Sequence, residues 1–141
     1  MARLWLWATT LAAVILCGCG ANTPQKTTHI ADREIILTEE AFEAGISDTL
    51  QLGRMRQGEI IAKTIRLHNG SGKPVVIIRE ATSCGCTTAQ YLRQPIAPSS
   101  SCDIAIEFDS QGQLGWQMKL MEFYFAEKAT PLKIYIDAEV E

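Results

Sequence analysis

Two cysteines separated by a single glycine, Cys84 and Cys86, are the residues of this sequence that are best suited to chemistry. Glycine adds nothing to a packed core and frees the backbone, so packing alone does not explain the pattern. Three interpretations are open. The pair can form a disulfide across a very small ring, which is strained and easily reduced. It can supply two thiolates to a soft ion such as Cu(I). Its thiols can also be purely structural and simply pack at a corner of a β-domain.

The elements that position this pair are predicted to be short β-strands separated by turns. A β-branched run at residues 75–78 directly precedes the pair and predicts a central strand. Apolar and polar residues alternate along 132–140 and along 104–108, as they do in strands with one buried face. Strands are expected at residues 50–53, 59–68, 75–82, 102–109, 117–125 and 132–140. This spacing of strands and turns is typical of an all-β sandwich.

The segment before these strands is expected to hold two further short elements. Residues 35–37 are apolar and predict a strand, and Thr38 is placed to cap a short helical turn that follows it. The domain is therefore expected to span residues 34–141.

The N-terminal 18 residues are expected to be a lipoprotein signal peptide. Arg3 is the only charge there, and the apolar run at 4–16 is too short to span a bilayer but has the length of a signal-peptide core. Residues 16–19 resemble the bacterial lipoprotein box. Cys19 fits the lipidated position because Gly18 precedes it, whereas Leu16 is too bulky to precede a lipidated Cys17. The alternative is an ordinary secreted protein with two chance cysteines.

Lipid on Cys19 makes the membrane the expected partner of the processed chain. Residues 19–33 are polar and threonine-rich, which predicts a flexible tether between lipid and domain. Loss of Arg3 leaves 12 Lys and Arg against 16 Asp and Glu, a net charge of −4 without a basic patch, so nucleic acid is not an expected partner. No acidic run follows Cys19, which favours the periplasmic face of the cell envelope over the cell surface.

An ordered series of motifs resembles a known bacterial family. The residues that carry the resemblance are Gly53, Gly58-Glu59, Ile65-x-Leu67-x-Asn69, Gly72-x-Pro74, Ser83-Cys84-Gly85-Cys86-Thr87, Ile96-x-Pro98, Ile104-x-Ile106-x-Phe108-Asp109 and Gly115. The family is the domain of unknown function 1573, common in Bacteroidetes lipoproteins and secreted proteins and similar to the immunoglobulin-like domains of major sperm protein and hydin. The resemblance covers about residues 46–140. It implies an immunoglobulin-like β-sandwich of about seven strands and carries no established activity.

This chain departs from the family pattern at two positions. Ser99 stands where the family usually has glycine, and Cys102 is an additional thiol. In an immunoglobulin-like strand order, Cys102 lies at the pole opposite Cys84 and Cys86, roughly 20 Å away, beyond the reach of about 7 Å that a disulfide allows between Cα atoms. Cys102 is two residues before Ile104 and so lies on the same inward face of the expected strand, which predicts a buried structural thiol. A disulfide between Cys102 and either Cys84 or Cys86 remains an alternative if the intervening strand is irregular.

The same strand order places the loops at 53–58 and 110–116 at the pole of the cysteine pair. Met55, and with it Met118, is then a candidate soft ligand for Cu(I) beside Cys84 and Cys86. Met118 and Met121 are also typical core residues. Trp116 is expected at the same pole, where its fluorescence would report on the thiols. His68 is expected at the other pole and His29 lies in the tether.

No enzyme constellation is recognisable in the sequence. It lacks paired carboxylates, a phosphate-binding glycine loop and the Gly-x-Ser-x-Gly and His-Glu-x-x-His motifs, and its two histidines are poorly placed for the cysteines. The expected function is that of a non-catalytic cell-envelope lipoprotein, a binding or scaffolding module with an envelope protein as partner and no cofactor. The alternative is a thiol-based protein that uses Cys84 and Cys86 for disulfide exchange or Cu(I) binding.

Overall fold

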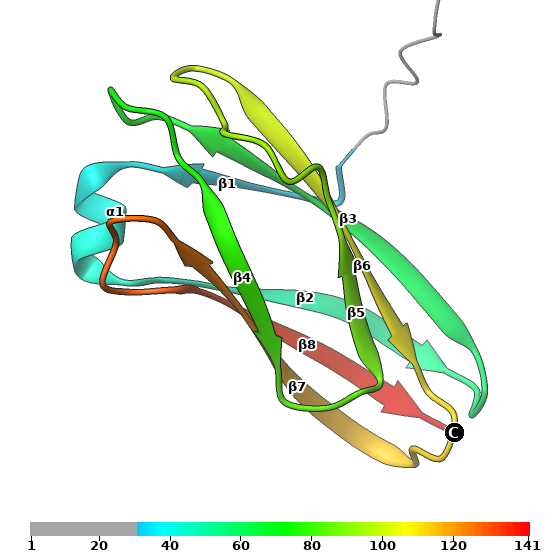
Figure 1. The fold of residues 1–141 in the computed structure, drawn as a ribbon. Coiled ribbons are helices and arrows are strands. Elements are labelled where there is room, and N and C mark those ends of the chain that lie inside the picture. Colours follow the sequence, from blue (N-terminus) through cyan, green and yellow to red (C-terminus); the bar gives the residue numbers. More distant parts are fainter. Residues whose placement is uncertain (1–30) are drawn as a thin grey trace, which may run out of the picture.

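The computed structural model describes residues 31–141 as a sandwich of two four-stranded sheets (Figure 1). One sheet has the order β1-β3-β6-β5 and the other the order β2-β8-β7-β4. The elements are β1 (Arg33–Leu37), α1 (Glu39–Ala44), β2 (Ile46–Met55), β3 (Ile60–Asn69), β4 (Ile77–Thr82), β5 (Thr87–Gln90), β6 (Ser101–Asp109), β7 (Gly115–Phe125) and β8 (Leu132–Val140). The predicted all-β sandwich is confirmed, with eight strands. The expected signal peptide, Cys19 and His29 lie outside the described residues.

The core lies between the sheets because alternate residues of the long strands point inward. On β8, Leu132, Ile134 and Ile136 are buried, and their register partners on β7 include Phe123 and Met121. The inward residues of β6, at 104, 106 and 108, are buried in the same way from the opposite sheet. Alternation along the sequence therefore reports correctly which face of each strand is buried.

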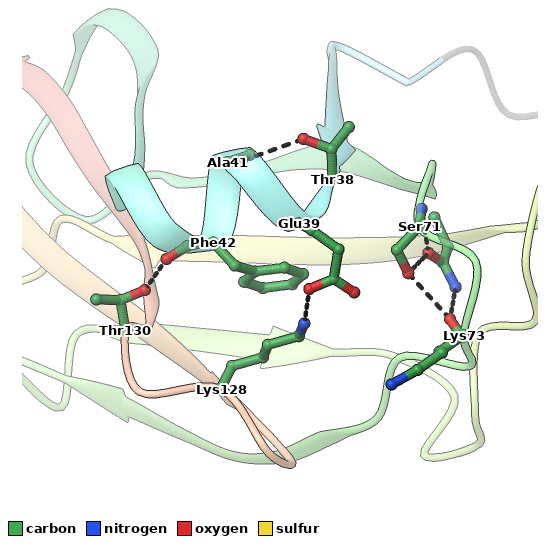
Figure 2. Close-up of polar contacts among 9 residues, drawn as sticks. Thr38, Glu39, Ala41, Phe42, Ser71, Lys73, Lys128 and Thr130 are labelled. Atoms are coloured by element: carbon green, nitrogen blue, oxygen red, sulfur yellow. Dashed lines mark hydrogen bonds and ion pairs between the residues drawn. The ribbon is translucent and has the colours of Figure 1, made fainter.

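One short helix carries the chain from the first sheet to the second. The Thr38 Oγ1 accepts a hydrogen bond of 3.1 Å from the Ala41 N–H, so Thr38 caps α1 as predicted (Figure 2). Phe42 of α1 packs edge-to-face on Phe125 with ring centroids 5.1 Å apart. An ion pair joins Lys128 to Glu39 across the same end of the sandwich. No helix among residues 31–141 is long and apolar enough to cross a membrane.

Two of the strand pairs are parallel. β1 pairs in parallel with β3, and β2 pairs in parallel with β8, whereas the other ladders are antiparallel. β1 begins at Arg33, and the Asp32 carboxylate already binds Lys63 Nζ at 2.9 Å. The folded domain thus begins slightly before the expected boundary at residue 34, inside the segment that was expected to be tether.

The expectation of a central strand at residues 75–78 is wrong. β4 begins at Ile77, lies at the edge of its sheet and pairs with β7 alone. The register shifts between Ile77 and Arg79, which leaves Ile78 exposed. Val75 forms only an isolated bridge with Ile96. A run of β-branched residues fits an edge strand as well as a central one when a bulge turns part of it to solvent.

Candidate functional site

Cys84 and Cys86 lie at the corner where the chain leaves one sheet for the other (Figure 1). β4 ends just before the corner in the second sheet, and β5 begins just after it in the first. A disulfide joins the two cysteines, with Cα atoms 5.3 Å apart, inside the range that such bonds need. Gly85 between them is exposed, while both cysteines are half-buried. Of the three interpretations, the structure therefore has the pair in its bonded form.

Hydrogen bonds fasten this corner to both sheets. The Ser83 N–H donates to the Leu120 carbonyl of β7 at 2.8 Å, and the Leu120 N–H donates to Ser83 Oγ at 2.9 Å. On the other side, the Asp109 N–H of β6 donates to the Cys86 carbonyl at 2.9 Å. The Thr82 and Thr87 hydroxyls bond to each other beneath the disulfide. The backbone of the corner is thus attached to both β6 and β7.

The other proposed soft ligands do not join the cysteine pair. Met55 is buried on β2, which is separated from β4 by two strands, so it lies about 14 Å across the sheet from the corner at the usual strand spacing. Met118 points to solvent on the outer face of β7, and Met121 is a core residue. The expected proximity of Met55 to the thiols is therefore wrong, whereas Met118 lies on the strand next to the corner, two residues from Leu120, with its side chain exposed. Within residues 31–141, no three His, Cys, Asp or Glu side chains are grouped as a metal site would need.

Cys102 is a free thiol far from the disulfide. It is the second residue of β6, opposite Leu67, whereas the Cys86 carbonyl is hydrogen-bonded to Asp109 at the other end of that strand, seven residues or about 23 Å away. Cys102 is half-buried against the core and borders a groove of 1240 Å³. It is thus less buried than its inward parity suggested. Burial, and then the charge of Asp103, raises the pKa of the Cys102 thiol, which keeps it protonated and unreactive near neutral pH.

Cys102→Ala is expected to lower the free energy of unfolding by about 1 kcal/mol, as a small truncation of a half-buried side chain does. The disulfide should be unaffected, because its two cysteines lie at the other end of β6. Urea denaturation gives the first quantity, and alkylation followed by peptide mass spectrometry gives the second. Alkylation of Cys84 or Cys86 in the variant, without added reductant, would contradict the assigned pairing.

Trp116 does not occupy the expected place beside the thiols. Its side chain points outward from β7, where the indole N–H donates to Asp137 Oδ1 at 2.7 Å. The corner is attached to Leu120, four residues or about 13 Å further along the strand. Thiol chemistry at Cys84 and Cys86 is therefore not expected to change the fluorescence of Trp116 strongly. His68 does lie at the far end from the pair, with Nδ1 3.0 Å from Ser101 Oγ.

A polar cluster that sequence reasoning missed lies at the open side of the sandwich, between β4 and β5. The Tyr91 hydroxyl donates to a Glu80 carboxylate oxygen at 2.5 Å, and Arg93 pairs with the other oxygen at 2.8 Å. Burial, and then the hydrogen bond to Glu80, raises the pKa of Tyr91 to about 12. The hydrogen bond from Tyr91 lowers the pKa of Glu80 despite some burial. Tyr91 also lines the groove that Cys102 borders.

The folded protein is expected to lose stability between about pH 10 and 12 because of Tyr91. An unfolded tyrosine loses its proton near pH 10, whereas the folded chain keeps it until about pH 12. The stabilising contribution is complete below pH 10 and disappears as the pH rises through the folded value. Tyrosinate absorbance should show a late titration step that is missing from Tyr91→Phe and retained by Tyr124→Phe. A late step that survives in Tyr91→Phe would refute the assignment.

Comparisons with known proteins relate this chain to a family and to a fold. The family model described as "Protein of unknown function (DUF1573)" matches residues 44–140. No curated protein sequence is a significant match. A protein of unknown function from Porphyromonas gingivalis W83 is a structural neighbour, with a TM-score of 0.58 and 23% identity over 66% of this chain and 44% of that one.

Two secreted proteases of Vibrio cholerae contain a similar fold. VesB matches with a TM-score of 0.53 and 13% identity over 66% of this chain and 30% of its own. VesC matches with a TM-score of 0.51 and 11% identity over 64% of this chain and 21% of its own. The chain thus spans less than half of each of these three structures. At such identities the likeness shows the fold alone.

Proposed function

The chain belongs to the family of proteins of unknown function DUF1573, and from this membership and the exposed surface of its sandwich we propose that it is a non-catalytic binding module of the cell envelope. The observation that carries the proposal is a stripe of exposed apolar side chains at Leu114, Trp116 and Met118, in and before the regular strand β7. Such stripes on an ordered surface are typical of sites that contact other molecules. The sandwich supplies the rigid support.

The proposed anchor is lipid on Cys19, which would hold the domain at the periplasmic face of the membrane. Mass spectrometry of the membrane fraction should find Cys19 acylated and residues 1–18 removed. Cys19→Ala should release the protein from the membrane, whereas the matched variant Cys17→Ala should not. Recovery of unmodified protein in the soluble fraction would refute the anchor.

The binding role is tested by photocrosslinking in the native bacterium. Benzoylphenylalanine is placed, one position at a time, at five exposed apolar residues spread over the sandwich: Ile36, Ile60, Ile78, Leu92 and Leu114. A discrete adduct with an envelope protein at any of these positions supports a binding module. Absence of adducts at all five positions would overturn it.

The half-exposed disulfide favours a second candidate function, thiol–disulfide exchange. An incoming thiolate would attack one sulfur and form a mixed disulfide as the other cysteine leaves as a thiolate. A second thiol of the partner would then complete the transfer, so that the partner is oxidised and Cys84 and Cys86 are reduced. The reduced pair could also hold Cu(I), with both thiolates as ligands.

The reduction potential of the pair separates these functions. Structural disulfides lie below about −300 mV, whereas exchange proteins lie at about −270 mV and above. Equilibration of the full chain in dithiol buffers, followed by alkylation and mass spectrometry, gives the value for Cys84 and Cys86. A value below about −300 mV would remove exchange as a function and leave the binding module.

A further inference from the structure

β7 has an open edge directly beside the disulfide corner. β4 pairs with β7 only from Phe125 to Met121, and the ladder ends with the two bonds between Ser83 and Leu120. The chain then leaves this sheet through Cys84 (Figure 1). Along Trp116–Lys119, β7 therefore pairs with β8 on one side, and no strand of residues 31–141 pairs with it on the other.

We call the unpaired side of β7 along Trp116–Lys119 the open lane. The backbone groups of two residues point into it. In an antiparallel ladder, the N–H and C=O of one residue point to one neighbour and those of the next residue point to the other neighbour. Leu120 points to the side of β4, because both of its groups bond to Ser83 there. Met118 and Trp116 share its parity, so their N–H and C=O groups face the lane. Their two N–H groups would donate to an added strand and their two C=O groups would accept from it, giving up to four hydrogen bonds.

The side chains of the same two residues form an apolar surface along the lane. Trp116 is 64% exposed and Met118 is 42% exposed on the outer face of β7, with Leu114 just before them 72% exposed. The bond from the indole N–H to Asp137 fixes the ring before any partner arrives. A fixed aromatic ring loses little conformational entropy on binding, which is why such residues serve as binding anchors.

The edges formed by β4 and β2 carry features that discourage strand addition, and the open edge of β7 does not. β4 has a register shift and the charged residues Arg79 and Glu80, and β2 has a register shift between Gln51 and Gly53. Charges and bulges are the usual protection of strand edges. In the open lane of β7 the single charged residue, Lys119, is turned inward and bonds to Gln113 Oε1 at 3.0 Å.

The acidic residues on the outer face of the sheet near the lane favour a basic partner. The register partners of Trp116 and Met118 on β8 are Glu139 and Asp137, which share their outer face. Arg54, the register partner of Glu139 on β2, is paired with Glu141 at 3.2 Å. The outer face is therefore acidic on the side of β7 away from the lane, about 10 Å or two strand spacings from an added strand, within reach of a long basic side chain that crosses β7. A basic strand is attracted to it, whereas a second copy of this chain would bring the same carboxylates and be repelled.

We propose that the open edge of β7 binds an extended segment of a partner protein, which adds as a strand along Trp116–Lys119 and carries lysine or arginine toward Asp137 and Glu139. This inference rests on the proposed binding function and names its surface and the chemistry of its partner. It is the mode in which main-chain bonds supply affinity and alternate side chains supply specificity.

Fluorescent nonapeptides test the proposal with the full chain in detergent micelles. One peptide alternates valine and lysine, and a second alternates valine and glutamate. The lysine peptide is expected to bind at least about tenfold more tightly by fluorescence anisotropy, a difference of about 1.4 kcal/mol. Amide exchange should slow at Trp116 and Met118 in the complex. Failure of the lysine peptide to bind, or equal affinity for both peptides, would overturn the proposal.

Two variants locate the interaction on the edge itself. Met118→Pro removes an N–H that faces the lane and not β8, so the sheet should tolerate it, and binding should weaken at least about tenfold. Met118→Thr keeps the N–H but removes apolar contact and should weaken binding less. Ile78→Thr, a change at another exposed apolar residue, on β4, should leave binding unchanged. Undiminished binding by Met118→Pro would refute the edge as the site.

Two further outcomes distinguish failure of this inference from failure of the proposed function. Crosslinks in cells from Ile78 or Leu92 but not from Leu114 would retain the binding module and exclude the β7 edge. A concentration-dependent dimer in analytical ultracentrifugation that Met118→Pro abolishes would assign the lane to a second copy and overturn the partner strand.

Discussion

Asn69→Ala is expected to lower the free energy of unfolding by about 3 kcal/mol, because the amide of Asn69 is a buried hub of hydrogen bonds. Its Nδ2 donates to the carbonyls of Lys73 and Ile96, both at 2.8 Å. Its Oδ1 accepts from the Ser71 N–H at 2.9 Å and from Ser71 Oγ at 2.7 Å. Figure 2 shows the neighbouring bond in the same turn, in which Ser71 Oγ donates to the Lys73 carbonyl at 3.0 Å. Alanine would leave these groups buried without their partner.

Ser71→Ala is the matched control for this network. It removes one hydroxyl and keeps the Asn69 amide with its two carbonyl partners, so it should cost only about 1 kcal/mol. Urea denaturation of both variants, followed by circular dichroism, compares the two free energies. If Asn69→Ala costs no more than Ser71→Ala, the amide does not organise this turn as the geometry indicates.

The two strands that alternation predicted, β6 and β8, both lie at the centre of a sheet. Along residues 104–108 and 132–140 they bury every second residue, and a period of two is a property of the sequence itself. β5 was missed because its four residues, Thr87–Gln90, show no such period. Its strand state depends on pairing with β6, a contact between distant segments that no local pattern reports.

The family resemblance explains a conformation that alternation could not. Ser99 has a φ of 59°, in the left-handed region that glycine adopts without cost. The glycine that the family resemblance implies at this position would adopt this backbone conformation more easily than serine. Serine accepts the strain here, with its N–H bonded to the Asn69 carbonyl at 2.8 Å.

The sequence predicted how far along its strand each site residue lies, but not which strands are neighbours in the sheet. Counting residues along β6 correctly separates Cys102 from the disulfide corner. The same counting put Met55 beside Cys84, because a position along the strand axis says nothing of the order of strands in the sheet. β2 and β4 lie at opposite edges of the same sheet. They are kept apart because β8 pairs with β2 and β7 pairs with β4, with β8 and β7 between them. Contacts between edges, such as Glu80 with Tyr91, were missed for the same reason.

Phe123→Ala is expected to have the largest effect of any single change considered, a loss of about 4 kcal/mol in the free energy of unfolding. Phe123 is fully buried in β7, and its ring meets Tyr91 edge-to-face with centroids 6.0 Å apart. Truncation leaves a cavity beneath Tyr91 as well as lost apolar contact. Since domains of this size are stable by about 5–15 kcal/mol, the variant should remain folded but close to its limit.

The cavity should also change the titration of Tyr91. Burial is the first cause of its raised pKa, so water that enters beside the ring should bring the pKa down toward the ordinary value near 10. Phe123→Leu fills most of the space and should cost less than about 1.5 kcal/mol, with the late tyrosinate step retained. Urea denaturation and tyrosinate absorbance measure the two effects separately. A large loss of stability with an unchanged Tyr91 titration would show that Glu80, and not burial against Phe123, sets the pKa of that tyrosine.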